Sequence, residues 1–220
     1  ANAKTATLLG TGWQAEAAAW ALAASRKLSK IKVYSPSREH RVAFAQKVGN
    51  DLSLEVVPVD SAKEAVRGAD IVAAATNSHE AVFQGGLVEE GMHLTSIQQT
   101  EMDEEAWQRA DLIVHSAPPD SYLSGGTANE LLKDIRTTGE HAKIGEQRRQ
   151  LYKEKGHTLS ELLAGAAPGR ADPSQVTLFD KGTGLGIEFA SLGKLVYDKA
   201  LAQGVGRDLP TEWFSQTSHP

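Results

Sequence analysis

The feature that most constrains the fold of this chain is a glycine-containing turn close to its start. A short apolar run, Ala6–Leu9, is followed by Gly10–Ala15, which has the pattern Gly-x-Gly-x-x-Ala, and then by an alanine-rich helical stretch. Gly10 permits a sharp strand-to-helix turn, Gly12 has no Cβ to obstruct a pyrophosphate, and Ala15 is small enough for the helix to pack closely on the strand. This order of strand, glycines and helix is typical of a dinucleotide-binding turn.

The pattern alone also fits an ordinary tight turn, so its context matters. A second apolar run, Ile31–Tyr34, follows within the ~30 residues of a βαβ unit. The first N–H groups of the intervening helix would face the phosphates, where the helix dipole favours negative charge. Trp20, further along that helix, is expected to lie in the core. The candidate cofactor-binding residues of this turn are Gly10, Thr11, Gly12, Trp13 and Gln14.

The composition argues against several classes of protein. The 220 residues include no cysteine, which excludes disulfides and thiolate metal sites. The net charge of −5 is spread without long like-charge blocks, which argues against nucleic acid as the main partner. No stretch approaches the ~20 apolar residues of a membrane span, and no segment resembles a signal peptide. We therefore expect a cytoplasmic protein with no metal site and with neither membrane nor nucleic acid as a partner.

Apolar β-rich runs alternate with helical patterns over the first half of the chain. This alternation predicts an α/β fold, with a doubly wound parallel sheet of the Rossmann dinucleotide-binding type. Asp60 or Ser61 is the expected cap of a short helix that runs through Val66. The six predicted strands are Ala6–Leu9, Ile31–Tyr34, Glu55–Val59, Asp70–Ala75, His93–Ile97 and Asp111–His115.

The pattern predicts a Rossmann-type NAD(P)-binding domain over residues 1–204, followed by a C-terminal tail, residues 205–220. The six-strand core occupies residues 4–116, and a loop-rich excursion at the edge of the sheet occupies residues 117–156. Residues 157–204 supply a last strand, Gln175–Phe179, and further helices. The closing helix, about Gly186 to Gln203, has apolar positions that suit one buried face.

The segment after the second strand bears on the choice of cofactor. NAD enzymes usually place an acid there to accept from the ribose hydroxyls, and such an acid repels a 2′-phosphate. This chain instead has Ser35, Ser37 and Arg38, with Arg41 one turn further on. Hydroxyls and a guanidinium can hold a phosphate, which favours NADP(H) over NAD(H). The alternative is that Ser37 only caps the next helix and Arg38 is solvated.

Two further segments are candidates for cofactor contact. Thr76, Asn77 and Ser78 follow the fourth strand, and Ile97 ends the fifth. Ligands of doubly wound sheets collect at the carboxyl ends of the strands, so these residues are expected near the nicotinamide ribose. For Thr76–Ser78 the alternative is an ordinary turn.

Seven sets of residues along the chain together carry a family resemblance. They are Gly10–Ala15, Val33–Ser35, Gly68–Val72, Ala75–Ser78, Gly91–Leu94, Glu161–Gly165 with Pro168–Arg170, and Thr177–Phe179 with Gly182–Leu185. In order and spacing the chain resembles the ornithine cyclodeaminase/mu-crystallin family from residue 6 to about residue 204. The resemblance implies a nicotinamide-dependent enzyme that moves a hydride between amine and imine at the α-carbon of an amino or imino acid. It also suggests cofactor or substrate contact for Lys181 and Thr183, although these residues equally fit a simple helix start.

The chain departs from the family pattern in two places. Family members carry a further segment ahead of the glycine turn that forms a dimerisation and substrate domain, and the homodimer expected from the resemblance would form through that segment. After Ile97 the family typically continues with glycine-rich sequence that often bears a catalytic aspartate, whereas this chain has Gln98–Glu101. No catalytic residue is therefore assigned.

The remaining titratable residues have plainer explanations. The acids Glu101, Asp103, Glu104 and Glu105 are expected to form a solvated helix start. His93 and His115 lie in apolar strands and are expected to be satisfied core histidines. The function predicted is the cofactor-binding portion of an NAD(P)(H)-dependent oxidoreductase or cyclodeaminase that acts on a small amino or imino acid. The alternative is a non-catalytic NAD(P)-binding module or a truncated binding protein.

Overall fold

The computed structural model describes residues 2–78, 80–116, 139–181 and 186–214. The chain divides into two compact units, Ala1–Thr183 and Gly184–Pro220, which are described separately here. This boundary precedes the last helix, whereas the sequence predicts a domain that extends to residue 204. The predicted domain limits therefore stay a prediction.

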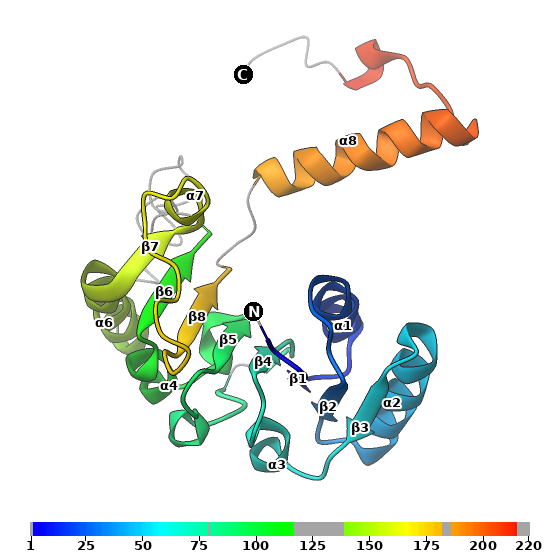
Figure 1. The fold of residues 1–220 in the computed structure, drawn as a ribbon. Coiled ribbons are helices and arrows are strands. Elements are labelled where there is room, and N and C mark those ends of the chain that lie inside the picture. The colour runs from blue at the N-terminus through cyan, green and yellow to red at the C-terminus, as the bar shows by residue number, and fades with distance from the viewer. Residues whose placement is uncertain (1, 79, 117–138, 182–185, 215–220) are drawn as a thin grey trace. The chain divides into compact units, whose positions relative to one another are not determined.

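Within the described residues, eight strands of the first unit form one sheet, and every neighbouring pair is parallel. The order across the sheet is β3-β2-β1-β4-β5-β8-β6-β7 (Figure 1). The chain runs outward from β1 on one side and then returns to place β4 on the other, which confirms the doubly wound parallel fold. The strands are β1 (Thr5–Leu9), β2 (Lys30–Tyr34), β3 (Glu55–Pro58), β4 (Ile71–Ala74), β5 (His93–Ser96), β6 (Leu112–His115), β7 (Gly156–Thr158) and β8 (Thr177–Asp180).

The helices of this unit begin at capping residues that the sequence makes recognisable. Ser37, Ser61 and Asp103 each accept a hydrogen bond from the backbone three residues on, as N-cap side chains do. Ser61 is thus the observed cap of the short third helix. The helices are α1 (Trp13–Ser25), α2 (Arg38–Leu52), α3 (Ala62–Val66), α4 (Glu104–Arg109), α6 (Gly139–Lys155) and α7 (Leu159–Leu163), with 3-10 turns η1 (Gly85–Leu87) and η2 (Gln99–Glu101).

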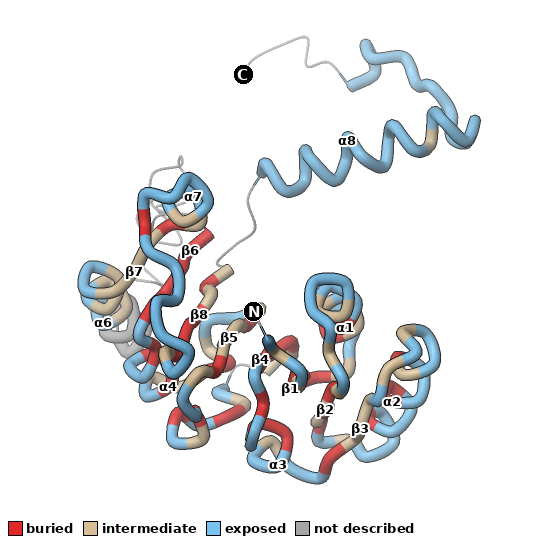
Figure 2. The backbone as a smooth tube through the Cα atoms, in the orientation of Figure 1, coloured by how far each residue is buried: buried red, intermediate tan, exposed pale blue. Residues whose placement is uncertain are grey.

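Helices cover both faces of the sheet, so its central strands are buried (Figure 2). Successive side chains of β1 enter different core clusters: Leu8 belongs to the cluster of Ala15 and Phe44, and Leu9 belongs to the cluster that includes Trp107. This alternation is the two-residue period of a strand buried on both faces. Strands that are buried on both faces have apolar residues at successive positions, and this is why the N-terminal strands could be recognised from the sequence.

Two strands of the second half were harder to foresee. The predicted strand Gln175–Phe179 is observed as β8, but it lies between β5 and β6 instead of following β6 in order. β7 was not predicted, because Gly156–Thr158 has no apolar run. The stretch at 117–138 lies outside the described residues, while 139–155 of the predicted excursion is the helix α6.

The second unit contains α8 (Gly186–Gln203) and the 3-10 turn η4 (Thr211–Phe214). Neither element has a buried residue, so the predicted burial of one face of the closing helix is not met within this unit. Phe189, Leu192 and Val196 are among its exposed apolar side chains. No described helix, α8 included, is long and apolar enough to span a membrane.

His93, at the start of β5, is a satisfied histidine, as predicted. Its Nδ1 lies 2.8 Å from Oγ1 of Thr177 on β8. Arg170 donates to the same hydroxyl at 3.0 Å, which places a guanidinium beside the imidazole. Burial, followed by the positive charges of Arg170 and Arg26, lowers the pKa of His93 to about 4.

This lowered pKa predicts a loss of stability in acid. An unfolded histidine titrates near 6.5, so between about pH 6.5 and pH 4 the unfolded chain binds more protons than the folded chain. The stabilisation is fully present above pH 6.5 and is lost as the pH falls through 4. We expect His93 to account for roughly 1–3 kcal/mol of the free energy of unfolding lost over this range. Urea denaturation of the native chain and of His93→Gln measures it, and an equal loss in both would contradict the prediction.

Candidate cofactor-binding site

The candidate site lies at the carboxyl ends of four neighbouring strands. In the parallel register Leu9 is aligned with Tyr34 of β2 and with Ala74 of β4, and Ala74 is aligned with Ser96 of β5. The segments that follow these strands therefore lie side by side at one edge of the sheet. This edge holds the switch point between β1 and β4, where open α/β sheets bind their ligands.

Gly10 is required by the close approach of the first turn to β4. Its φ of +118° lies in the region that favours glycine, and a Cβ at this position would lie 2.2 Å from the carbonyl oxygen of Ala75. The amide of Gly10 also donates to the carbonyl of Tyr34 at 2.8 Å. The turn is thus bound between β2 and β4, as the sequence pattern predicts.

Gly12 is required for a different reason. It is the N-cap residue of α1, it provides no side-chain cap, and a Cβ there would meet nothing within 4 Å. The first helical turn therefore has no side-chain cap, and the space beside Gly12 is open, as a bound pyrophosphate requires. Ala15 is fully buried and lets α1 pack on the sheet. The residues present fit a dinucleotide at this turn.

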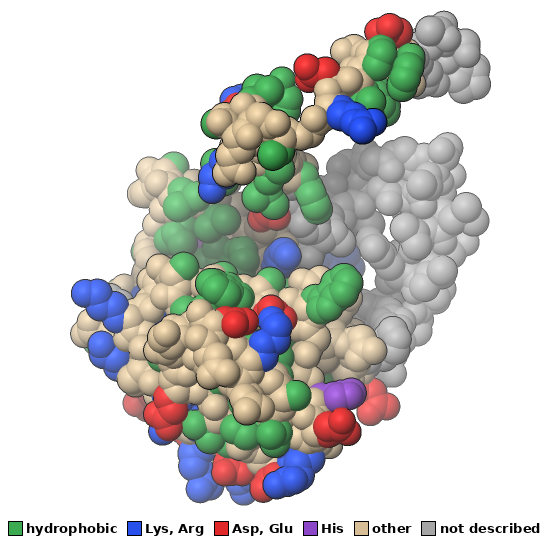
Figure 3. All heavy atoms as spheres, turned by 90° about the vertical axis from the view of Figure 1, so that its right-hand side faces the viewer, with side chains coloured by type: hydrophobic (Ala, Val, Ile, Leu, Met, Phe, Trp, Pro, Cys, Tyr) green, Lys and Arg blue, Asp and Glu red, His purple; other side chains and the backbone are tan. Residues whose placement is uncertain are grey.

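The outer face of α1 carries two tryptophans. Trp13 is 90% exposed, and Trp20 is 49% exposed, so the expectation that Trp20 lies in the core is wrong. The helix buries Ala15 and Ala19, one turn apart, and this small-residue face directs Trp20 away from the sheet. A shallow depression of about 350 Å³ is lined by Trp13, Glu16, Ala17 and Trp20. On the face that carries α1 and α2, Figure 3 shows hydrophobic side chains in separate patches with charged side chains between them.

Glu101 is the largest departure from expectation in the site. It was predicted to be part of a solvated helix start, but its side chain is fully buried. Its carboxylate accepts from the amide and hydroxyl of Thr76 at 2.5 and 2.7 Å, and from the amides of Ile97 and Gln98 at 3.0 and 2.8 Å. One carboxylate thereby joins the segments that follow β4 and β5.

The other three acids of this group, Asp103, Glu104 and Glu105, have different surroundings. Asp103 caps α4 by accepting from the amide of Ala106 at 2.9 Å, and Glu105 is an exposed partner of Arg109. Burial raises the pKa of Glu104, against the opposing effect of Arg148. The prediction of a helix start was thus correct for Asp103 and Glu105 and wrong for Glu101. The chain position of Glu101, five residues after the end of β5, contains no signal for its burial.

The segment after β2 has one free cation among its described residues. Ser35 is buried, and Ser37 caps α2, so part of the plainer interpretation holds. Arg41 is also buried: it donates to the carbonyl of Ser35 at 3.0 Å and pairs with Asp60. Arg38 is exposed and has no hydrogen bond or ion pair to a described residue. Of the two arginines, only Arg38 is available to a ligand.

The other candidate residues for cofactor contact follow β4 and β8. Thr76 Oγ1 accepts from the amide of Ser78 at 3.0 Å, so Thr76–Ser78 is both a hydrogen-bonded turn and part of the site, while Asn77 is exposed. Lys181 follows β8, whose last residue is aligned with Ser96, so it lies next to the end of β5. Thr183 lies outside the described residues.

A buried polar group at the same edge was missed from sequence. His115 on β6 and Asp180 on β8 approach to 3.1 Å between Nδ1 and Oδ2, and Gln99 donates to the same carboxylate oxygen at 2.8 Å. Nε2 of His115 is buried without a partner among the described residues, so this histidine is only partly satisfied. His115 and Asp180 are far apart in the sequence, and no local pattern relates them. The described residues contain no group of three or more acids or histidines that could hold a metal ion.

A known family matches this fold and site. The model of the ornithine cyclodeaminase/mu-crystallin family matches residues 1–204. The chain belongs to this family. The glycine turn, the fold and the order of motifs thus agree with the resemblance seen in the sequence.

Individual relatives are similar over nearly the whole chain. A Δ1-pyrroline-2-carboxylate reductase of Bacillus cereus is 27% identical over 215 residues, which are 94% of this chain and 61% of the relative. An ornithine cyclodeaminase of Brucella suis is 27% identical over 217 residues, which are 94% of this chain and 54% of the relative. The chain thus spans less than two thirds of the length of these relatives.

The solved structures show the same partial coverage. The Δ1-pyrroline-2-carboxylate reductase of Thermococcus litoralis, solved in complex with NADH and L-proline, superposes with a TM-score of 0.75 at 28% identity. The match covers 94% of this chain and 61% of that one. The described fold is therefore one that binds a nicotinamide dinucleotide in a relative.

The two glycines of the turn predict opposite outcomes on substitution. Gly12→Val should leave the fold nearly unchanged, because a Cβ meets nothing there, but should abolish dinucleotide binding by filling the pyrophosphate space. Gly10→Ala should destabilise the fold by roughly 2–4 kcal/mol, because of its positive φ and its contact with Ala75. Thermal unfolding and NADH fluorescence titration separate the two effects. Unchanged cofactor affinity in a folded Gly12→Val chain would mean that the glycines serve only the turn.

Removing the buried carboxylate should damage both the fold and the site. Glu101→Ala removes a fully buried side chain and the acceptor of four hydrogen bonds, although the Ile97 amide keeps the Ala74 carbonyl as a partner. We therefore expect a loss of roughly 3 kcal/mol in the free energy of unfolding, with weaker cofactor binding. The control is Glu105→Ala, which removes an exposed acid from the first turn of α4 and should change stability by only about 0.5 kcal/mol. Similar stability of the two variants would contradict the role given to Glu101.

Proposed function

We propose that this chain is the cofactor-binding portion of an NAD(P)(H)-dependent oxidoreductase or cyclodeaminase that acts on a small amino or imino acid. The observation that carries this proposal is the open helix N-terminus at Gly12, at the switch point of a sheet that a relative solved with NADH shares. The reaction class is hydride transfer at the α-carbon, as the names of the relatives suggest.

The chain's own residues would divide the work of holding the cofactor. The first-turn N–H groups from Trp13 and Gln14 would bind the pyrophosphate, with Thr11 beside them. Thr76, Asn77, Ser78 and Ile97 would lie near the nicotinamide ribose, and Lys181 would approach the same end. For Thr183, cofactor or substrate contact is what the family resemblance implies. When bound, the nicotinamide supplies the hydride or accepts it. The Glu101 carboxylate would keep the segments after β4 and β5 at a constant separation during binding.

The segment after β2 supports a preference for NADP(H) over NAD(H). Residues 35–38 include no acid to accept from the ribose hydroxyls, and the guanidinium of Arg38 is exposed and uncommitted among the described residues. Ser37 can add a hydroxyl beside its capping role. Arg41 would act indirectly, because its bonds to Ser35 and Asp60 hold the loop that presents Arg38.

The whole protein's assembly and location are also proposals. We infer a homodimer that forms through the part of the relatives that this chain does not span, and a cytoplasmic location. The second candidate function, a non-catalytic NAD(P)-binding module, is favoured by one observation. Glu101, the acid nearest to the ends of β4 and β5, already accepts four hydrogen bonds and is not free for proton transfer.

Substitution of Arg38 tests the cofactor preference. Arg38→Ala should weaken NADPH binding by ~1.5–3 kcal/mol, the value of a hydrogen bond to a charged group, and should leave NADH binding unchanged. Arg67→Ala removes an equally exposed arginine from the segment after α3 and is the control. Both cofactors are titrated by fluorescence. An equal loss of affinity for both cofactors, or a preference of the unmodified chain for NADH, would contradict the proposed preference for NADP(H).

The isolated chain should bind the reduced cofactor but turn over no amino or imino acid at an appreciable rate. Binding one reactant leaves the other unpositioned, and orientation can account for ~7–11 kcal/mol of barrier lowering. The test is fluorescence binding of NADH and NADPH, followed by absorbance assays with alanine, ornithine, lysine and cyclic imines. Failure to bind either cofactor would overturn the proposed function. Robust turnover would instead place the catalytic groups within these residues.

A further inference from the structure

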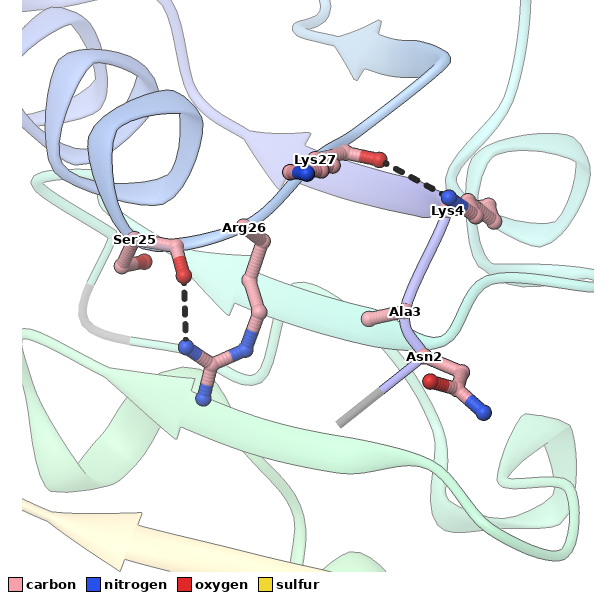
Figure 4. Close-up of a pocket in the computed structure, with 6 residues that line it drawn as sticks. All are labelled: Asn2, Ala3, Lys4, Ser25, Arg26 and Lys27. Atoms are coloured by element: carbon pink, nitrogen blue, oxygen red, sulfur yellow. Dashed lines mark hydrogen bonds between the residues drawn. The ribbon is translucent and has the colours of Figure 1, made fainter.

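A second depression lies at the amino end of the sheet, at the opposite end of β1 from the glycine turn. It has a volume of about 440 Å³ and is lined by Asn2, Ala3, Lys4, Ser25, Arg26 and Lys27. These residues come from the segment that precedes β1 and from the segment that ends α1 (Figure 4). Because a strand rises about 3.3 Å per residue, the five residues of β1 separate this depression from Gly10 by roughly 15 Å. It is therefore distinct from the candidate cofactor site.

The depression has an excess of positive charge. Its lining includes Lys4, Arg26 and Lys27 and no acid. The acid that contacts this segment is Asp70, whose Oδ2 accepts from the amides of Lys4 and Thr5 at 2.7 and 2.8 Å. Three cations against one carboxylate leave a local excess of two positive charges in a chain whose net charge is −5.

The donors of these cations are mostly unused. One nitrogen of the Arg26 guanidinium donates to the Ser25 carbonyl at 2.7 Å, and its other N–H groups have no partner among the described residues. Nζ of Lys4 reaches the Lys27 carbonyl only at 3.4 Å, at the long limit of a hydrogen bond. Nζ of Lys27 has no partner in the described part of the chain. Figure 4 shows Arg26 and Asn2 on opposite sides of the opening.

The charge of Arg26 also extends across this edge of the sheet. Together with Arg170 it contributes to the lowered pKa of His93 at the start of β5. Arg170 is held there by the carbonyls of Gly91 and Met92 at 2.7 and 3.1 Å. An anion placed against Arg26 would reduce the positive charge that this arginine exerts on His93.

We propose that this depression is a binding site for the phosphate group of a small molecule, separate from the cofactor site. A guanidinium and two ammonium groups around one opening match the charge and the acceptor oxygens of a phosphate dianion. The amide of Asn2 adds a neutral donor. The volume leaves room for an organic part attached to the phosphate, so a phosphomonoester and inorganic phosphate share the chemistry that the site recognises.

The test is calorimetric titration of the 220-residue chain with inorganic phosphate. The chain is saturated with NADPH so that the glycine turn is filled, and chloride keeps the ionic strength constant. The double variant Arg26→Gln/Lys27→Gln should bind phosphate at least about tenfold more weakly, as expected for lost hydrogen bonds to a charged group. Lys63→Gln/Arg67→Gln removes the same charge around α3 and should retain the affinity within about twofold. Because the substituted side chains are exposed, both variants should fold.

Further binding measurements identify the ligand and show whether phosphate binding depends on the cofactor site. Gly12→Val, tested without NADPH, should still bind phosphate. In the unmodified chain, phosphate should raise the pKa of His93 measured by NMR. Tighter binding of glycerol 3-phosphate than of inorganic phosphate supports an organic phosphomonoester, and equal binding supports the free ion. Equal binding of succinate, equal affinity in the Arg26/Lys27 double variant, or the absence of phosphate binding at millimolar concentration would overturn the proposal.

Discussion

The candidate site depends on the close approach of the turn after β1 to the end of β4. The carbonyl of Ala75 occupies the space in which any Cβ at residue 10 would lie, so only glycine permits this approach. The same contact directs α1 so that its first turn opens at the carboxyl edge of the sheet. The positions of Gly12, Thr76 and their neighbours follow from this one steric requirement.

A buried carboxylate then holds this edge together. Glu101 accepts from the backbone amide of Thr76 after β4 and from the amides of Ile97 and Gln98 after β5. It is supplied by η2, within the segment where the family typically has glycine-rich sequence. The chain therefore uses an acid of this region for structure.

The two ends of the sheet attract anions by different means. At the carboxyl end, the backbone N–H groups and the dipole of α1 would meet the pyrophosphate, and Arg38 is the exposed cation after β2. At the amino end the helix presents carbonyls, and the positive charge comes from Lys4, Arg26 and Lys27. The first arrangement belongs to the fold, whereas the second depends on side chains that a few substitutions would remove.

The sequence by itself determined the glycine turn, the first six strands, the helix caps and the family, because each is a local pattern of spacing and residue type. Only the tertiary structure decided that β8 lies between β5 and β6, that Glu101 is buried, that Trp20 is exposed, and that His115 meets Asp180. Each of these depends on contacts between residues far apart in the chain. Local periodicity holds no information about which strand becomes a neighbour or which acid receives its donors.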